Sequence, residues 1–277
     1  MGLINYNGEI LPDDSPIFTI NRAIQYGDGL FETLRNHNGE ILFFQDHFDR
    51  LIEGMRALKI NVPVHFTLPF FHKQFLDLAY RDGMASNARL RIGVFRSGKG
   101  IYTPESHSAE FYLQIIPLNK GFEWEDRRCE LGVYSQIPKN YSSISFFKSA
   151  NALPYVMAAI FKDDHNFDDC ILLNSFGKIA DAISSNIFWL ERKRIFSVPM
   201  ADGGVAGVMS KNLIAILKHH RFFVEEKSIT PHDLAKADEV FLTNVIWGIK
   251  PVTRFHDTEF STLQAKEIFN LLKEILK

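Results

Sequence analysis

The hexapeptide Phe146-Phe147-Lys148-Ser149-Ala150-Asn151 places a lysine directly after two aromatic residues and just before an expected helix. Residues 143–148 read as extended, and Pro154 is tolerated in the first turn of the helix that follows. Partial desolvation in such a place disfavours the ammonium form and lowers its pKa, which an amine that attacks a carbonyl carbon needs. The alternative is an ordinary lysine at the end of a strand, with its charged head in water.

The next polar feature along the chain is Asp181, followed by the run Ser184-Ser185-Asn186-Ile187-Phe188. Residues 174–177 have the composition of a turn, and Asp181 lies on the strand that leaves it. A carboxylate in this place is able to pair with a heterocyclic nitrogen cation. Taken alone, it is more often a solvated charge beside a hairpin.

Two later segments indicate an anion site. Gly203-Gly204-Val205-Ala206-Gly207-Val208-Met209-Ser210 precedes a helix, and glycines there let backbone N–H groups face an anion with help from the helix dipole. Such helix entries are common, and the spacing fits neither a Walker loop nor a dinucleotide fingerprint. Thr243 and Asn244 end an apolar strand in small polar groups within reach of a phosphate, although many strands end this way for solvation.

Around these segments, apolar periodicity predicts intermingled helices and strands. Helices are expected over 46–59 with Asp46 as cap, over 68–80 with Thr67 as cap, after Lys148, and over 211–219 and 262–276. Strands are expected over 88–95, 110–117, 130–137 and 169–173, near Ile187 and Ile195, and over 239–243. There is no βαβ period and no internal repeat, so the expected class is α+β or mixed α/β.

A polar stretch over residues 117–126 predicts the domain boundary. We therefore expect a small N-terminal domain over 1–117, whose sheet is mixed and carries helices, and a larger domain over 118–277.

The composition excludes several classes of protein. Of the 277 residues, 46% are hydrophobic and 23% are charged, which is an ordinary globular balance. The net charge of −2 gives no general attraction to nucleic acid or to an anionic membrane. No apolar run is long enough for a membrane span, and residues 1–6 do not have the pattern of a signal peptide. The two cysteines are too few for a disulfide framework or a metal cage, so a reduced cytoplasmic setting and no metal are expected.

Taken together and in order, these motifs resemble the class IV aminotransferases, which are fold type IV pyridoxal phosphate enzymes. The resemblance runs over nearly the whole chain. It rests on Asn21 to Arg35, His47-Phe48-Asp49-Arg50-Leu51, Lys148, Asp181 with Ser185-Asn186, Gly207-Val208-Met209, and Thr243-Asn244 leading to Pro251-Val252. It implies a two-domain architecture with pyridoxal 5'-phosphate between the domains, and a homodimer in which a second subunit completes the substrate pocket.

The resemblance also implies a role for each matching residue. Lys148 is the lysine that binds the cofactor aldehyde and moves the proton between the substrate Cα and the cofactor. Arg50 looks like the arginine that binds the phosphate through a planar two-donor contact, with a helix-surface charge as the alternative. Asp181 stands where the family usually has Glu, opposite the pyridine nitrogen, and the shorter side chain leaves its reach in doubt. The remaining cofactor contacts are expected from Ser185, Asn186, Gly207, the backbone of Val208 and Met209, Thr243 and Asn244.

Within the family, the run after Lys148 is similar to that of D-amino acid transaminases and aminodeoxychorismate lyases, because Asn151 stands three residues after the lysine. The Gly-Gly-Asn-Tyr run typical of branched-chain enzymes is not found there. Phe31-Glu32-Thr33 and the segment 98–104 look like the lyases, and Phe31 is taken as substrate-binding. However, Lys99 replaces an arginine that is common in the lyase glycine loop, which weakens the contacts for a dicarboxylate.

The sequence therefore favours a transaminase acting on a D-amino acid or a branched-chain amino acid and a 2-keto acid. The alternative is an aminodeoxychorismate lyase that releases pyruvate and 4-aminobenzoate. A binding module without catalysis is disfavoured, because Lys148 and the phosphate residues are present.

Three arginines are candidates for binding a substrate carboxylate, namely Arg89, Arg91 and Arg96. Arg89 and Arg91 share one face of an expected strand. The alternative for these arginines is the solvent face of an edge strand.

Overall fold

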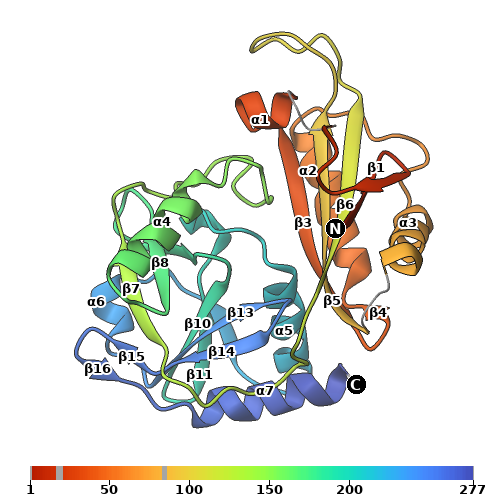
Figure 1. The fold of residues 1–277 in the computed structure, drawn as a ribbon. Helices are drawn as coiled ribbons and strands as arrows, with labels where there is room; N and C mark the ends of the chain where they lie inside the picture. Colours follow the sequence, from red (N-terminus) through yellow and green to blue (C-terminus); the bar gives the residue numbers. More distant parts are fainter. Residues whose placement is uncertain (1, 17–20, 83–85, 277) are drawn as a thin grey trace. The chain divides into compact units, whose positions relative to one another are not determined.

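The computed structural model describes residues 2–16, 21–82 and 86–276 (Figure 1). The chain folds into two compact units, the first formed by residues 1–121 and 147–151 and the second by residues 122–146 and 152–277. The predicted ranges of 1–117 and 118–277 are contiguous. In contrast, the first compact unit also includes the short segment that carries Lys148.

The first unit contains a six-stranded sheet in the order β2-β1-β6-β5-β3-β4. Its strands are β1 (Leu3–Tyr6), β2 (Glu9–Pro12), β3 (Gly29–His37), β4 (Glu40–Ile41), β5 (Asn87–Arg96) and β6 (Ala109–Pro117). All of their pairings are antiparallel, so the expected mixed sheet is wrong in this respect.

Helices α2 (Phe44–Ala57) and α3 (Leu68–Asp82) pack on this sheet, and the short α1 (Arg22–Tyr26) precedes β3 (Figure 1). Alternation along β5 sends Ala88, Leu90, Ile92 and Val94 into the apolar core that the helices cover. Residues 89, 91 and 93 of β5 therefore face away from this core.

The predicted helices of this unit are confirmed, with one correction at a cap. Thr67 accepts a hydrogen bond from the backbone N–H of Phe70 at 3.3 Å, as expected for the cap of α3. Asp46 is not the cap of α2, because the helix begins two residues earlier and Asp46 lies in its first turn. In the first turn, the negative charge of Asp46 interacts favourably with the positive end of the helix dipole.

The second unit has two five-stranded sheets. One has the order β12-β11-β10-β13-β14, and the other has the order β16-β15-β7-β8-β9. The first sheet comprises β10 (Asn186–Glu191), β11 (Arg194–Ser197), β12 (Val224–Glu226), β13 (Glu239–Asn244) and β14 (Gly248–Val252). The second comprises β7 (Glu130–Tyr134), β8 (Asp169–Leu173), β9 (Ile179–Ala182), β15 (Arg254–Phe255) and β16 (Thr258–Glu259).

One apolar core joins these two sheets, with Ile171 and Ile179 from one sheet and Trp189 and Leu242 from the other. The helices of this unit are α4 (Leu153–Asp164), α5 (Val208–His219), α6 (Pro231–Leu234) and α7 (Leu263–Ile275), with a 3₁₀ turn η2 (Met200–Asp202). Helix α4 packs on β8, and α7 packs on β14.

Most predicted elements of this unit are confirmed, including β8 over Asp169–Leu173 and a helix with Pro154 in its first turn. The expectation that residues 143–148 are extended is wrong. Residues 143–146 form turns, because the Ser145 side chain and backbone both bond back to Ser142. Within the described ranges, no helix is both long enough and apolar enough to cross a membrane.

Candidate functional site

The segment that carries Lys148 runs beside the start of β3 in the first unit. The backbone N–H of Phe31 donates to the Lys148 carbonyl at 2.8 Å, and the N–H of Ala150 donates to the Gly29 carbonyl at 2.9 Å. The Asn151 side chain adds a bond to the Gly27 carbonyl at 3.2 Å. These bonds fix the backbone of the lysine against a buried strand.

The side chain of Lys148 meets a second cation at one aromatic ring. The Lys148 Nζ atom lies 4.7 Å from the centroid of the Phe31 ring, and the Arg91 guanidinium carbon lies 4.1 Å from the same centroid. A ring face stabilises both charges through its quadrupole. An amine and a guanidinium therefore lie around one apolar surface, on the side of the sheet opposite to the helices.

Arg89 and Arg91 lie on β5, which pairs with β3 on one side and β6 on the other. The alternative of an edge strand is therefore wrong for these two arginines. Burial lowers the pKa of Arg89, and the charge of Arg91 lowers it further. The Nε atom of Arg89 is buried and makes no hydrogen bond within the described residues.

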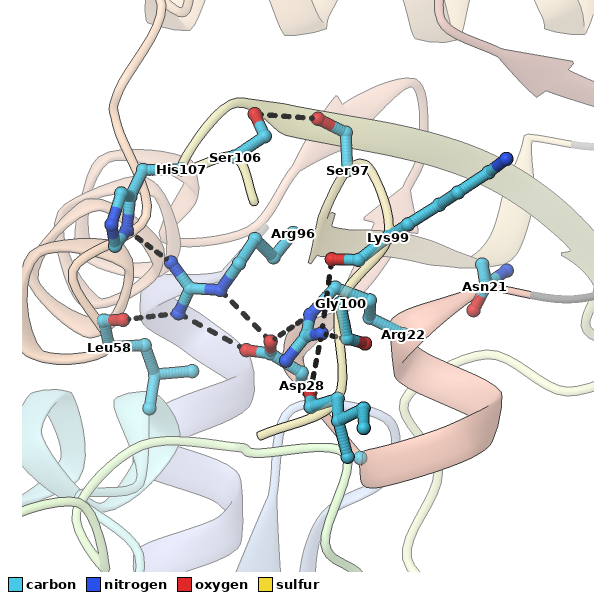
Figure 2. Close-up of polar contacts among 12 residues, drawn as sticks. Asn21, Arg22, Asp28, Leu58, Arg96, Ser97, Lys99, Gly100, Ser106 and His107 are labelled. Atoms are coloured by element: carbon cyan, nitrogen blue, oxygen red, sulfur yellow. Dashed lines mark hydrogen bonds and ion pairs between the residues drawn. The ribbon is translucent and has the colours of Figure 1, made fainter. Parts of the chain in front are cut away.

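Arg96 lies at the end of β5 and is held by a different set of contacts (Figure 2). Its guanidinium bonds to both oxygens of Asp28, to the carbonyls of Leu58 and Lys59, and to His107. Arg96 is 6% exposed, so these contacts clip the end of β5 to the end of α2.

Asp28 also accepts from Arg22 at 2.8 Å. Burial alone would raise the pKa of Asp28, but hydrogen bonds and charges from Arg96 and Arg22 lower it below its ordinary value. Arg22 in turn donates to the carbonyls of Gly100 and Ile101, each at 2.9 Å, while the Lys99 side chain extends away from Asp28 (Figure 2). Arg96 thus holds parts of the unit together, while Lys99 joins the cluster only through its backbone carbonyl, which accepts from Arg22 at 3.4 Å.

Arg50 lies on α2 in a buried cluster with Glu32 and His47. Its Nε atom donates to Glu32 Oε1 at 2.7 Å, and its Nη2 atom donates to Glu32 Oε2 at 2.6 Å. The Nδ1 atom of His47 lies 2.8 Å from Glu32 Oε2. Arg50 is 8% exposed, so the alternative of a helix-surface charge does not describe it.

The electrostatics of this cluster follow from its burial. Desolvation would raise the pKa of Glu32, but the Arg50 charge and the bonds from His47 and Arg50 lower it to about 2. Desolvation lowers the pKa of His47, with Glu32 opposing and the charges of Arg50 and Lys148 adding to the effect. At neutral pH the cluster therefore holds an ionised carboxylate, a guanidinium and a neutral imidazole.

In the second unit, Asp181 lies on β9 and is 3% exposed. One of its oxygens accepts from the backbone N–H of Val205 at 3.0 Å and from the Tyr155 hydroxyl at 3.2 Å. The other accepts from the Asn186 amide at 3.3 Å and from the N–H of Ala182 at 3.2 Å. These four donors are uncharged groups that stabilise the carboxylate, and the charge of Lys139 also interacts with it.

The start of α5 is the candidate phosphate cradle, and it lies in the same unit. Gly207 precedes the helix in an extended conformation with no side-chain cap, and a Cβ atom there would lie 1.7 Å from Asn186 Oδ1. The adjacent Ser185 is 6% exposed, and its buried hydroxyl makes no hydrogen bond within the described part of the chain. Backbone N–H groups of a first helical turn, beside a hydroxyl that lacks a partner, suit a phosphate.

Thr243 and Asn244, at the end of β13, use their side chains to hold a turn. The Thr243 hydroxyl donates to the Gly248 carbonyl at 2.7 Å, and Asn244 Oδ1 accepts from the N–H groups of Ile246 and Trp247. The Asn244 amide donates to the Ser184 carbonyl at 3.2 Å, next to Ser185. Their contribution to the cradle is therefore to place Ser185 and the strand end.

Sequence reasoning missed Glu32, His47 and Tyr155 as parts of these clusters. Glu32 and His47 stand inside motifs that identified the family, but no local pattern shows that they bond across fifteen residues. Tyr155 falls in the helix expected after Lys148, and no role is expected for it from the sequence. Its spacing of seven residues from Lys148 was the available signal.

The model of the family "Amino-transferase class IV" matches residues 29–255. Over 241 residues the chain is 27% identical to an aminodeoxychorismate lyase of Vibrio harveyi. This match covers 84% of this chain and 85% of that protein. It is 25% identical over 280 residues to a putative branched-chain-amino-acid aminotransferase of Methanocaldococcus jannaschii, covering 99% and 95% of the two chains.

Among solved structures, the branched-chain aminotransferase of Thermoproteus uzoniensis, crystallised with norvaline, superposes with a TM-score of 0.88. The identity is 22%, and the match covers 99% of this chain and 94% of that one. A likeness at this identity concerns the fold, and it confirms the predicted α+β class with fold type IV architecture.

Proposed function

The chain belongs to the class IV aminotransferases, a family that depends on pyridoxal 5'-phosphate, and from this premise we propose that it transfers an amino group between a small amino acid and a 2-keto acid. The observation that carries the proposal is the pair of cations around Phe31. Lys148 supplies an amine and Arg91 supplies a guanidinium, within 4.7 Å and 4.1 Å of one ring centroid. An amino acid presents a reactive carbon next to a carboxylate, and this pair of side chains matches both.

In each unit, taken by itself, there are residues whose chemistry fits the cofactor. The phosphate suits the Ser185 hydroxyl and the first turn of α5, where the missing Cβ of Gly207 lets the Asn186 side chain lie against the helix start. Arg50 is held rigidly by Glu32 and is the guanidinium that we assign to the same phosphate. Asp181 is assigned to the ring nitrogen, because it is a buried carboxylate whose position is fixed by the Tyr155 hydroxyl, the Asn186 amide and the N–H of Val205.

When bound, the cofactor would supply an aldehyde carbon that takes up the amino group, with water as the leaving group, and a ring that accepts electrons from the substrate Cα. The chain's own residues do the rest. Lys148 would hold the cofactor through Nζ, and its amine would move the proton at the substrate Cα. Arg91 binds the substrate carboxylate through its guanidinium, and Phe31 keeps water away from the amine.

Substrate type separates the remaining possibilities. Relatives of this chain are named for branched-chain amino acids and for aminodeoxychorismate. We propose transamination of a D-amino acid or a branched-chain amino acid as the main activity, with lyase chemistry as the alternative.

The test is a panel of both enantiomers of small amino acids, assayed with and without pyruvate or 2-oxoglutarate. We expect turnover that requires the keto acid. Release of pyruvate and 4-aminobenzoate from aminodeoxychorismate, with no keto acid added, would support the lyase instead. Inertness in all of these assays would refute both.

We also propose that the protein works as a homodimer in the cytoplasm. Support comes from the family and from Cys129 and Cys170, which are buried and unbridged. Sedimentation equilibrium should give twice the chain mass of 31.8 kDa. A mass of one chain at micromolar concentration would contradict the dimer.

A further inference from the structure

Tyr112 lies on the same face of the first unit's sheet as Arg91. In the register of β5 and β6, Tyr112 stands opposite Gly93, two residues beyond Arg91. A Cβ atom at Gly93 would lie 2.0 Å from Cε1 of the Tyr112 ring. The tyrosine ring therefore lies flat over the backbone of β5, and this placement requires glycine at position 93.

From this position the Tyr112 hydroxyl accepts a hydrogen bond from Arg91 Nε at 2.9 Å. The bond uses the inner edge of the guanidinium, while the group stacks on the Phe31 ring at 4.1 Å. The terminal nitrogens of Arg91 make no hydrogen bond to any described residue. One bond and one ring thus fix the plane of the guanidinium and leave its outer fork open to a planar anion.

The neighbouring Arg89 explains why Arg91 needs this hydrogen bond. It stands two residues before Arg91 on the same face, and the charge of Arg91 acts on it. Two like charges side by side repel, so an arginine without an anchor would turn away from its neighbour. The Tyr112 hydroxyl holds Arg91 in place against this repulsion.

We propose that Tyr112, seated on Gly93, is a positioning residue that aims Arg91 at the carboxylate of the substrate. The inference rests on the proposed function, in which Arg91 binds this carboxylate. It assigns to Tyr112 no contact with the reacting atoms, so its loss should weaken substrate binding more than the chemical step.

The variant Tyr112→Phe keeps the ring over Gly93 and removes only the hydroxyl. Loss of a hydrogen bond to a charged group corresponds to roughly a tenfold effect or more. We expect KM for the amino acid to rise about tenfold, with kcat changed less than about twofold. Calorimetry on the holoenzyme should show a similar loss of affinity for isovalerate, a monocarboxylate that competes for Arg91.

Tyr6→Phe is the matched control. Tyr6 stands opposite Tyr112 in the register of β1 and β6, but its hydroxyl donates to Glu110 and not to Arg91. This variant should keep the wild-type KM and isovalerate affinity. Gly93→Ala, which displaces the ring, should reproduce the Tyr112→Phe effect.

Each outcome decides the point. A Tyr112→Phe enzyme with wild-type KM and isovalerate affinity overturns the proposal. An enzyme that unfolds, or whose kcat falls by as large a factor as its KM rises, overturns it as well. If Arg91→Ala leaves isovalerate binding intact, the fault lies with the proposed function, because Arg91 would not hold the carboxylate.

Discussion

Glu32 and Asp181 are two buried carboxylates that the chain treats in opposite ways. Glu32, in the first unit, is bound by a guanidinium at 2.6 and 2.7 Å and by an imidazole at 2.8 Å. Asp181, in the second unit, is held by a phenol, an amide and two backbone N–H groups at 3.0 to 3.3 Å. Glu32 is therefore bonded directly to a cation, whereas the donors to Asp181 named here are uncharged groups and the charge of Lys139 acts on it as well.

The proposed function gives these two carboxylates different roles. A buried ion pair is often no more stable than an apolar packing of the same volume, but the loss of one partner is costly. Glu32 therefore acts on Arg50, whose orientation it fixes. Asp181 is the carboxylate that we propose for the ring nitrogen of the cofactor.

The largest expected effect on stability comes from Glu32→Gln. The substitution leaves the buried Arg50 without its counter-charge, so the free energy of unfolding should fall by about 3 kcal/mol or more. Urea denaturation of the apo protein measures it. Glu53→Gln, at an exposed position of the same helix, is the control and should change stability by less than about 0.5 kcal/mol. Equal effects of the two variants would show that the ion pair contributes nothing.

The stability contributed by Glu32 should also depend on pH. The pKa of Glu32 is about 2 in the folded protein and 4.5 ordinarily, so its contribution to stability is fully present above pH 4.5. This contribution is lost as the pH falls from 4.5 towards 2. The stability difference between wild type and Glu32→Gln should therefore shrink over this interval in urea titrations at successive pH values. A difference that stays constant down to pH 2 would contradict the shifted pKa.

Asp181→Asn should cost less stability than Glu32→Gln but remove more activity. The amide nitrogen meets donors such as Tyr155 and Val205, so about 1–3 kcal/mol of stability should be lost. The variant should still bind the cofactor phosphate, while kcat falls by about a hundredfold or more because the charge beside the ring nitrogen is gone. Stopped-flow kinetics gives kcat, and an unchanged kcat would place Asp181 among the structural carboxylates.

Ser185→Ala should have the smallest effect. Its hydroxyl makes no bond within the described ranges, so the apo protein should lose little stability. Affinity for pyridoxal 5'-phosphate should fall about fivefold, which corresponds to about 1 kcal/mol for one hydrogen bond. Ser184→Ala, at an exposed neighbour, should leave it unchanged. Identical cofactor affinities in the two variants would exclude Ser185 from the phosphate site.

The elements with strong apolar periodicity were predictable from sequence. Strand β8 and helix α7 follow from uninterrupted patterns that tertiary structure does not override. Strand β3 was not assigned, because Glu32 and Arg35 break its pattern although both are buried. Residues 143–148 were misread because a serine turn replaces the extended backbone.

The main residues of the candidate site were predictable from sequence, but their hydrogen-bond partners were not. Motifs identified Lys148, Arg50 and Asp181, since family resemblance carries residue types at fixed places in the chain. It did not carry their partners, because the bonds from Arg50 to Glu32 and from Tyr155 to Asp181 join residues far apart in sequence. Arg96 is the opposite case. Its residue type suggests a substrate contact, but its side chain bonds to Asp28 and His107 and so holds parts of the first unit together.

The most direct measurement is to reduce the holoenzyme with borohydride and map the modified peptide by mass spectrometry. Reduction fixes pyridoxal 5'-phosphate permanently to the amine that holds it. The cofactor mass should lie on Lys148, and Lys148→Ala should carry none while unfolding at the same urea concentration as the wild type. Labelling of another lysine, or labelling that persists in Lys148→Ala, would contradict the assignment of this amine.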